Sequence, residues 1–471
     1  MSNTKVRAGS DAMGTEKIPT LILRFAIPAI LTMLVNALYN FTDKIFVGQG
    51  VGAVGMAATT VSMPAMSIMV AIATLVGTGG NALLAIKLGE GKKEEAEGIL
   101  GNSVVLVTLL AVIFTVLGHL FVEPILMAFG ADADILPYAT TYLRIIISGM
   151  LFQSLSSAIC NYIRTEGNPT RAMVSSMSGV VVNIVLDGLF VMVFHWGIAG
   201  AAIATVIAQI VSCCMVMSYF TVGKKSTIRL TKATLRCEKS IAFRSMQLGF
   251  ATFVGQMMGS LVNVLLNNSL KFYAGAAGTV STSVAISAIG ITTGIGSIFV
   301  MSIGGLQQAV QPIMGYNYGA KKYDRLRQTV LIGCAMGLTF LLIGYACIML
   351  FTEQWVLLFG SVENQAAMDY TIYTVRTYNT CMPLIAITQI CTNYFVATGQ
   401  AFKATILSMS RQIFGLIPFM LILPRIFGLN GVVMSFPLAD FIVCSVVVGM
   451  MVVEWKKLKT LEARLPDPTL E

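Results

Sequence analysis

The chain has 471 residues, of which 56% are hydrophobic and only 11% are charged. Soluble domains carry roughly 25% charged residues, so a water-facing globular protein is excluded. The net charge of +9 does not indicate a nucleic-acid partner, because the basic residues lie in short loops between apolar runs, where they set membrane orientation. We predict an all-α polytopic membrane protein, since backbone groups in lipid must be paired within helices.

Apolar runs long enough to cross a bilayer follow one another along the sequence. A polar segment, residues 1–17, comes first and lacks the pattern of a cleavable signal peptide. Six transmembrane helices are predicted in residues 18–222, near 20–46, 55–86, 98–120, 136–163, 172–194 and 198–222. A basic linker, 223–244, precedes six more in residues 245–455, near 245–272, 280–314, 327–350, 367–397, 404–426 and 431–454. Residues 456–471 form a polar tail.

Lysine and arginine gather in alternate loops, together with the linker and both tails. The loop residues of this set include Lys92, Lys93, Arg164, Arg171, Lys321, Lys322 and Lys403. The intervening loops are nearly free of positive charge. Because basic loops stay in the cytoplasm, we predict that both termini are cytoplasmic and that the chain is a multi-pass protein of the plasma or bacterial inner membrane.

The two halves of the chain share short motifs at an offset of about 230 residues. Residues 121–130 parallel 351–360, Asn161-Tyr162 parallels Asn393-Tyr394, and Gly197 parallels Gly428. Six helices precede the end of each copy, so both copies have the same orientation. This predicts two six-helix bundles related by an axis along the membrane normal, an arrangement typical of transporters that expose a central cleft alternately to each side.

Ionisable residues inside membrane helices are costly and therefore indicate function. Asp43, Asp187 and Thr205 are predicted on three helices of the first half at similar depth, with Asn183 one helical turn from Asp187. Two carboxylates with amide and hydroxyl oxygens can bind a proton or a sodium ion. The alternative is a static hydrogen-bonded network. Pro28 shares the first helix with Asp43 and can let that helix bend.

The second half carries Arg411 and Asp440 inside its helices, which we interpret as either a buried ion pair or a substrate contact. The sequence has no GxxxxGK[ST] phosphate-binding loop and no metal-ligand motif, and its nine cysteines form no CxxC pair. We therefore expect no cofactor, no resident metal and no ATP-driven step.

The chain resembles the multidrug and toxic compound extrusion (MATE) family, in its MepA- and DinF-like bacterial branches. The resemblance rests on the first helix with Pro28 and Asp43, on Arg164-Thr-Glu-Gly-Asn-Pro169, on Asn183-Ile-Val-Leu-Asp187 and on Gly315-Tyr-Asn-Tyr-Gly319. It implies two lobes around a V-shaped cleft. It also implies a coupling site in the first lobe made of Asp43, Asp187, Asn183 and Thr205, with Pro28 allowing bending and Asn161 as the match to a helix-four asparagine.

The chain departs from a second branch of that family, which has acidic residues in helices seven and ten. The corresponding helices here offer only neutral polar residues, among them Gln256, Asn263, Gln389 and Asn393. These four residues, with Arg411 and Asp440, are candidate substrate contacts of the second lobe. The absence of acids argues against cation coupling of that second type.

The expected function is secondary active export of small organic, often cationic, compounds by antiport with H⁺ or Na⁺. The protein is not expected to be an enzyme, and we expect a monomer whose partners are its substrates and membrane lipids. One alternative is a flippase for a lipid-linked precursor, which several arginines lining the cleft would favour. A membrane-embedded lipid-modifying enzyme is an alternative of another class, although no DxxD-type metal motif supports it.

Overall fold

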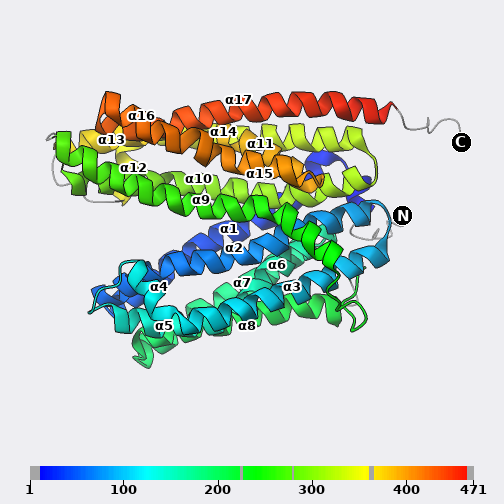
Figure 1. The fold of residues 1–471 in the computed structure, drawn as a ribbon, viewed down its shortest axis with the longest axis horizontal. Helices are drawn as coiled ribbons and strands as arrows, with labels where there is room; N and C mark the ends of the chain where they lie inside the picture. The colour runs from blue at the N-terminus through cyan, green and yellow to red at the C-terminus, as the bar shows by residue number, and fades with distance from the viewer. Residues whose placement is uncertain (1–10, 223–225, 278–280, 360–364, 464–471) are drawn as a thin grey trace, which may run out of the picture.

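The computed structural model describes residues 11–222, 226–277, 281–359 and 365–463. The first lobe contains a short turn, η1 (Asp11–Gly14), followed by α1 (Ile18–Gly50), α2 (Ala53–Gly89), α3 (Lys93–Leu120), α4 (Val122–Ala128), α5 (Leu136–Ser148), α6 (Met150–Thr165), α7 (Pro169–Asp187), η2 (Gly188–Val193) and α8 (Gly197–Thr221). Helices α2 to α8 lie in the lower half of Figure 1, whereas η1 and the start of α1, in dark blue, reach into the upper half.

The second lobe forms the upper half of Figure 1. It contains α9 (Lys239–Ala277), α10 (Thr282–Gly319), α11 (Tyr323–Leu350), α12 (Thr352–Phe359), α13 (Gln365–Asn379), α14 (Leu384–Ala397), α15 (Ala401–Ser410), η3 (Arg411–Leu416), α16 (Ile417–Phe427) and α17 (Leu429–Glu462). Over the described residues, eleven helical spans are long and apolar enough to cross a membrane, and the bent pair α5–α6 completes twelve. The prediction of a twelve-helix membrane protein in two bundles is confirmed.

Over the described residues, four of the predicted helices are interrupted. The fourth span bends by 52° between α5 and α6, at Gly149. The tenth span is broken between α13 and α14, where Pro383 lacks the N–H that a continuous helix needs. The fifth and eleventh spans contain the π-helical segments η2 and η3, each of which is six residues long.

The predicted segment boundaries differ from the structure at two helix ends. Helix α9 begins at Lys239, inside the predicted linker, and Asn102 of α3 donates a hydrogen bond to the Glu238 carbonyl just before this helix. Helix α17 continues to Glu462, into the predicted tail. Residues 1–10 and 464–471 of the predicted tails lie outside the described residues.

The two lobes share a core at one end and separate at the other. We call the end that carries η1 and the end of α17 the terminal end, and the opposite end the distal end (Figure 1). The largest buried cluster joins residues of both lobes, such as Leu84 and Leu100 with Val310 and Ile313, whereas the buried residues of the distal clusters each belong to one lobe.

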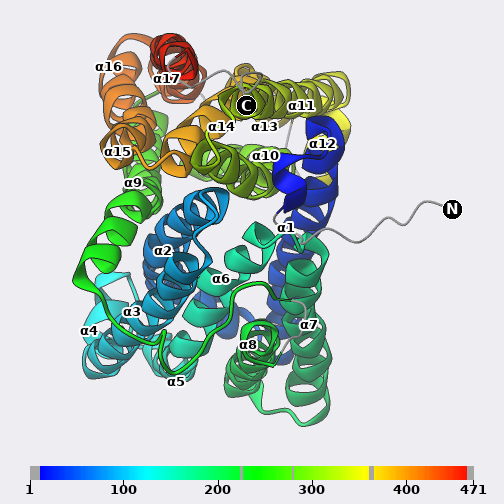
Figure 2. The same ribbon diagram turned by 90° about the vertical axis from the view of Figure 1, so that its right-hand side faces the viewer.

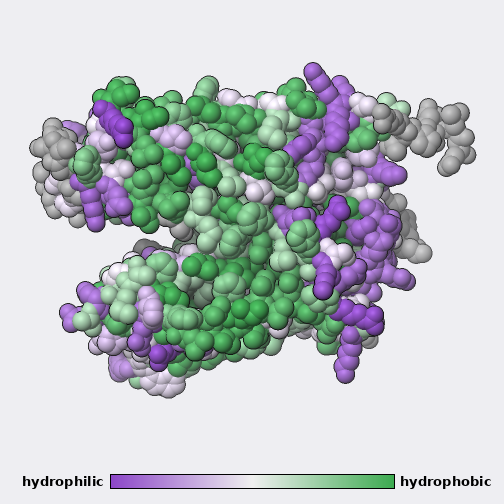
Figure 3. Space-filling view, viewed as in Figure 1, coloured by the Kyte–Doolittle hydropathy of each residue, from purple (hydrophilic) through white to green (hydrophobic). Residues whose placement is uncertain are grey.

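The space between the lobes opens at the distal end. Figure 3 shows this hollow, with apolar side chains over the middle of the molecule and hydrophilic side chains at the terminal end. Helices α1 and α2 of the first lobe contact α10 and α9 of the second, and these two pairs form the seam between the lobes (Figure 2). The expected V shape follows from this shared base.

Candidate functional site

Two carboxyl groups from different helices meet in the distal half of the first lobe. Asp187 ends α7 and is completely buried, whereas Asp43 on α1 is half-buried. The two groups lie close enough to share a hydrogen bond when one of them carries a proton. Within the described part of the chain, Oδ1 of each group has no hydrogen-bond donor. Because unpaired carboxylates are costly in such surroundings, the pair is suited to bind a proton or a small cation.

Asn183 and Thr205 complete the same cluster, and both are buried. With its amide nitrogen toward Asp187, Asn183 donates to Oδ2 of that carboxylate at 2.7 Å. Its amide oxygen then accepts from Oγ1 of Thr205 at 3.3 Å. The structure therefore brings together Asp43, Asp187, Asn183 and Thr205 from α1, α7 and α8. All of their available ligand atoms are oxygens, which are the ligands that hard cations prefer.

Two tyrosines that we did not predict also belong to this cluster. The Tyr39 hydroxyl lies beside Thr205 and close to both carboxyl groups. Tyr142 of α5 is buried within electrostatic range of the same two acids. Tyr39 precedes Asp43 by four residues and so shares its helical face, a spacing that the sequence already contained. Tyr142 is 99 positions from Asp43 in sequence, and nothing local indicates their proximity.

The backbone around Asp187 has an unusual shape. The α-helical pattern of α7 ends at this residue, and the π-helical turn η2 begins at Gly188. A Cβ at Gly188 would lie 3.9 Å from the ring of Phe46, an ordinary van der Waals contact, so this position faces α1. Isolated π-helical turns are frequent at functional sites, where they change the direction of a side chain.

Asn161 does not join this cluster. It lies in the last turn of α6, at the terminal end, whereas Asp43 lies in the distal part of α1. The side chain of Asn161 instead accepts a hydrogen bond from Arg164, three residues further along α6. Its placement in the coupling site, which rested on the family resemblance alone, has no support in this geometry.

Helix α1 is divided between the two lobes. Its first half packs with η1 against the second lobe: Asn317 and Arg325 donate to the Met13 carbonyl at 3.1 Å each, and the buried Met13 side chain joins the shared core. At Gly305 of α10, an added Cβ would lie 2.8 Å from the backbone of Ile30.

The second half of α1 packs on the first lobe instead, where Val47 and Val191 belong to one buried cluster. Pro28 lies near the change from one partner to the other and interrupts the hydrogen bonding of α1. Asp43 and the anchor at Met13 are thus on opposite sides of a helix break.

The second lobe contains an ion pair at a related place. Arg411 begins the π-helical turn η3, and its Nε donates to Oδ1 of Asp440 on α17 at 2.6 Å. A second contact joins Nη2 of Arg411 to Oδ2 of Asp440 at 3.4 Å. The side chain of Asp440 is 7% exposed and that of Arg411 is 33% exposed. Of our two interpretations of these residues, the structure contains the ion pair.

The other polar candidates of the second lobe differ in their surroundings. Asn393 is buried and donates to the Gln307 carbonyl at 3.0 Å, so its amide nitrogen has a partner within the lobe. Gln256 and Asn263 are exposed on α9, and Gln389 is half-buried on α14. Among the described residues, no group of three or more His, Cys, Asp or Glu side chains could hold a metal ion.

A family model described as MatE matches residues 28–189 and 257–421. The chain belongs to the MatE family. This membership confirms the family resemblance and places the chain among membrane transporters, not enzymes. The Multidrug export protein MepA of Staphylococcus saprophyticus is 24% identical over 432 residues, which cover 92% of each chain.

Solved MATE structures have the same fold as this MatE chain. One is the outward-facing conformation of a multidrug resistance MATE family transporter of the MOP superfamily, with a TM-score of 0.89 and 23% identity over 98% of this chain and 100% of that one. Another, MATE in the bent conformation, has a TM-score of 0.90 at 23% identity, with the same coverage. At these identities the likeness shows the fold alone.

Proposed function

We propose that this MatE protein is a secondary active antiporter that exports small organic, often cationic, compounds in exchange for H⁺ or Na⁺. The observation that carries the proposal is the contact between Asp43 and Asp187 inside the first lobe. Two carboxyl groups in one buried site favour the uptake of a positive charge, and a proton or a sodium ion can supply it. The staphylococcal relative is named a multidrug export protein, which supports drugs as the cargo and export as the direction of transport.

The distribution of basic residues supports a cytoplasmic terminal end. Lys92, Arg171, Lys322 and Lys403 belong to loops or helix starts at that end, together with Arg229 of the segment between the lobes. In this orientation the cleft is open to the outside. The outside cation then reaches the first lobe through the open cleft, while the exported compound leaves by the same opening. Since the cleft lies within one chain, we expect the monomer in the plasma membrane to be the transporting unit.

Helix α1 provides the link between the cation and the lobes in this proposal. When a cation joins Asp43 and Asp187, the distal part of α1 is held on the first lobe. The terminal part remains attached to the second lobe through the hydrogen bonds that Asn317 and Arg325 donate to the Met13 carbonyl. Bending near Pro28 is therefore how neutralisation of the acids would change the arrangement of the lobes. The two states would differ by which part of α1 moves with which lobe.

A flippase for an anionic lipid-linked precursor has less support. Arg144 at the distal end pairs with Glu123 at 3.2 Å, and both side chains are about half exposed. Arg376 donates from Nε to the Thr352 hydroxyl at 3.2 Å, within the second lobe. Arg411 is already paired with Asp440. The described arginines of the transmembrane region therefore do not form the shared basic site that a pyrophosphate group would need.

The test is transport by purified protein in liposomes with an imposed pH or sodium gradient and ethidium as the probe cation. Asp43→Asn and Asp187→Asn should each reduce gradient-driven ethidium transport to that of protein-free liposomes. Glu123→Gln, an acid-to-amide change at the exposed surface of the same lobe, is the matched control and should keep wild-type transport. Gradient-driven transport at the wild-type rate by either aspartate variant would overturn the proposal.

A further inference from the structure

A groove lies on the seam between α1 and the second lobe, away from the carboxyl pair. Its volume is about 480 Å³. Ala26 and Ile30 of α1 form one wall, Ile303 and Leu306 of α10 form the floor, and Ala335 and Thr339 of α11 form the other wall. Figure 2 shows α1 alongside α10 and α11, in agreement with the contacts between these helices. We call this site the seam groove.

The chemistry of the seam groove is apolar. Ser302, one of its few polar lining residues, donates its hydroxyl to the Ile298 carbonyl of its own helix at 3.3 Å. The small side chains of Ala335 and Thr339, one helical turn apart, leave the opening that larger residues would close. An anion or a hydrated cation would lose its polar partners in such a site, so the occupant must be hydrocarbon.

The groove faces the hydrocarbon of the bilayer. Its rim residues Ile27 and Ile343 are 54% and 66% exposed, and both belong to helices that span the membrane. Bilayer hydrocarbon is therefore the medium in contact with the opening. Transfer of a lipid chain from this medium gains nothing from the hydrophobic effect, so preference for the groove arises from the closer packing contacts of a concave surface.

The position of the groove matters as much as its lining. Ile30 lines it and also makes the close contact with Gly305, and Pro28 lies between the lining residues Ile27 and Ile30. Its walls come from helices assigned to different halves of the chain. A ligand that touches α1 on both sides of Pro28 together with α10 and α11 binds best to one bend of α1, and it therefore stabilises the arrangement of the lobes that goes with that bend.

We propose that the seam groove binds one acyl chain of a membrane phospholipid, which bridges α1 and the second lobe beside Pro28. This site is separate from the carboxyl pair and does not depend on the choice of coupling ion. Occupancy by the chain would favour the arrangement described here, with the cleft open at the distal end. Lipid composition would then affect transport without contact between the lipid and the exported compound.

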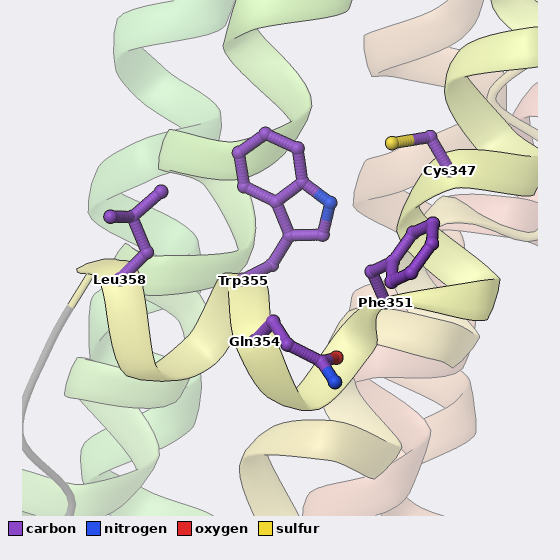
Figure 4. A pocket seen from close by; sticks show the side chains of 5 residues that line it. All are labelled: Cys347, Phe351, Gln354, Trp355 and Leu358. Carbon is purple, nitrogen blue, oxygen red and sulfur yellow. The ribbon is translucent and has the colours of Figure 1, made fainter.

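The structure offers a matched control site for the test. A second apolar recess, of about 200 Å³, is lined by Cys347, Phe351, Gln354, Trp355 and Leu358 at the distal end of α11 and along α12 (Figure 4). All of its lining residues belong to the second lobe, so a lipid chain bound there would not connect α1 with the second lobe. It reports the labelling expected of an ordinary lipid-facing recess.

The experiment uses the full-length protein in phosphatidylglycerol liposomes that contain a phosphatidylglycerol with a photoactivatable diazirine in the middle of one acyl chain. After illumination, mass spectrometry locates the labelled residues. Residues 23–30 and 335–343 should be labelled about fivefold more than residues 347–358, an excess equivalent to about 1 kcal/mol. Thr339→Phe and, separately, Ala335→Leu should remove the excess, whereas Leu358→Phe in the control recess should not.

Three results would overturn the proposal. Equal labelling of the two sites would show ordinary lipid contact. Loss of the label upon addition of ethidium would show that the groove is a passage for the exported compound. Cross-links between two protein chains at the groove would show that a second copy covers it. Because two different substitutions narrow the groove, misfolding of one variant leaves the other to decide.

Discussion

The two lobes differ in whether their buried charges are balanced by a charge of opposite sign. In the first lobe, Asp43 and Asp187 lie close together at the junction of α7 and η2, and among the described residues neither forms an ion pair, although the charge of Lys44 acts on Asp43. In the second lobe, Arg411 at the start of η3 is paired with Asp440. Both sites lie at a π-helical turn of the second-last long helix of their lobe. In our proposal the first lobe therefore takes its cation from solution, whereas the cation of the second lobe, Arg411, belongs to its own helix.

This difference separates two roles that a charged membrane residue can have. A site whose negative charge has no positive partner responds to the surrounding ion concentration, because a bound ion stabilises the state that binds it. A site whose charges are already balanced responds little, and the removal of one partner mainly affects stability. We expect the first lobe to determine coupling and the second lobe to provide a fixed scaffold. The following variants test that division.

Asp43→Lys should have the largest effect, because it gives the first lobe an attached cation like that of the second. The lysine would pair with Asp187, so ion-driven ethidium transport should fall to the level of protein-free liposomes. The stabilisation of the protein against heat by the coupling ion should also disappear. Asp134→Lys, which makes the same exchange in an exposed loop, is the control. Retained ion-driven transport in Asp43→Lys would show that the carboxyl pair is not the coupling site.

Asp440→Leu should destabilise the protein by about 3–5 kcal/mol, because it leaves Arg411 without its partner in the second lobe. The double variant Arg411→Met/Asp440→Leu should recover most of this loss, since no charge remains unpaired. Thermal unfolding in detergent measures both effects. A double variant that is stable but does not transport ethidium would contradict the scaffold role and would indicate that the ion pair contacts substrate.

Gly305→Ala should destabilise the seam between α1 and α10 by about 1–3 kcal/mol, because the new methyl group overlaps the backbone of Ile30. Transport should fall several-fold, since α1 loses its fixed contact with the second lobe. Gly304→Ala is the matched control, because an added Cβ at Gly304 meets no atom within 4 Å. If the two variants had the same thermal unfolding and the same ethidium transport, the contact between Ile30 and Gly305 would have no role in coupling.

Asn183→Ala should have the smallest effect of the four. It removes the hydrogen bond to Asp187, which contributes about 1.5–3 kcal/mol when the acceptor is charged. The ion concentration that gives half-maximal transport should therefore change, while the maximal rate changes less. Ser178→Ala, on the same helix, removes only a hydroxyl that bonds within α7 and is the control. An unchanged ion dependence in Asn183→Ala would place Asn183 outside the cation site.

Much of the first-lobe cluster could be predicted from sequence because depth in a membrane helix follows from residue number. The rise per residue placed Asp43, Asp187 and Thr205 at one level, and the four-residue spacing placed Asn183 below Asp187. The same arithmetic, applied to the direction of the fourth span, places Asn161 near the opposite end. Tyr39 could have been found by its spacing from Asp43.

Other features depend on tertiary contacts that no local pattern encodes. The rotation of α17 relative to η3 decides whether Arg411 reaches Asp440, and residue spacing does not fix this rotation. The π-helical turns have no distinctive composition. The division of α1 between the lobes was also hidden, because chain order assigns residues 18–222 to the first lobe. The contacts of Met13 and Ile30 with the second lobe are among those that reveal it.

The anchor of α1 also has a consequence for biosynthesis. The Met13 carbonyl accepts hydrogen bonds from residues that lie 304 and 312 positions later in the chain. At a synthesis rate of about 5–20 residues per second, the partners of Met13 emerge about 15–60 s after it. The first helix therefore enters the membrane long before its terminal half can reach its final neighbours. Although α1 is the first helix to be synthesised, we expect it to be among the last to reach its final packing, after α10 and α11 have been inserted.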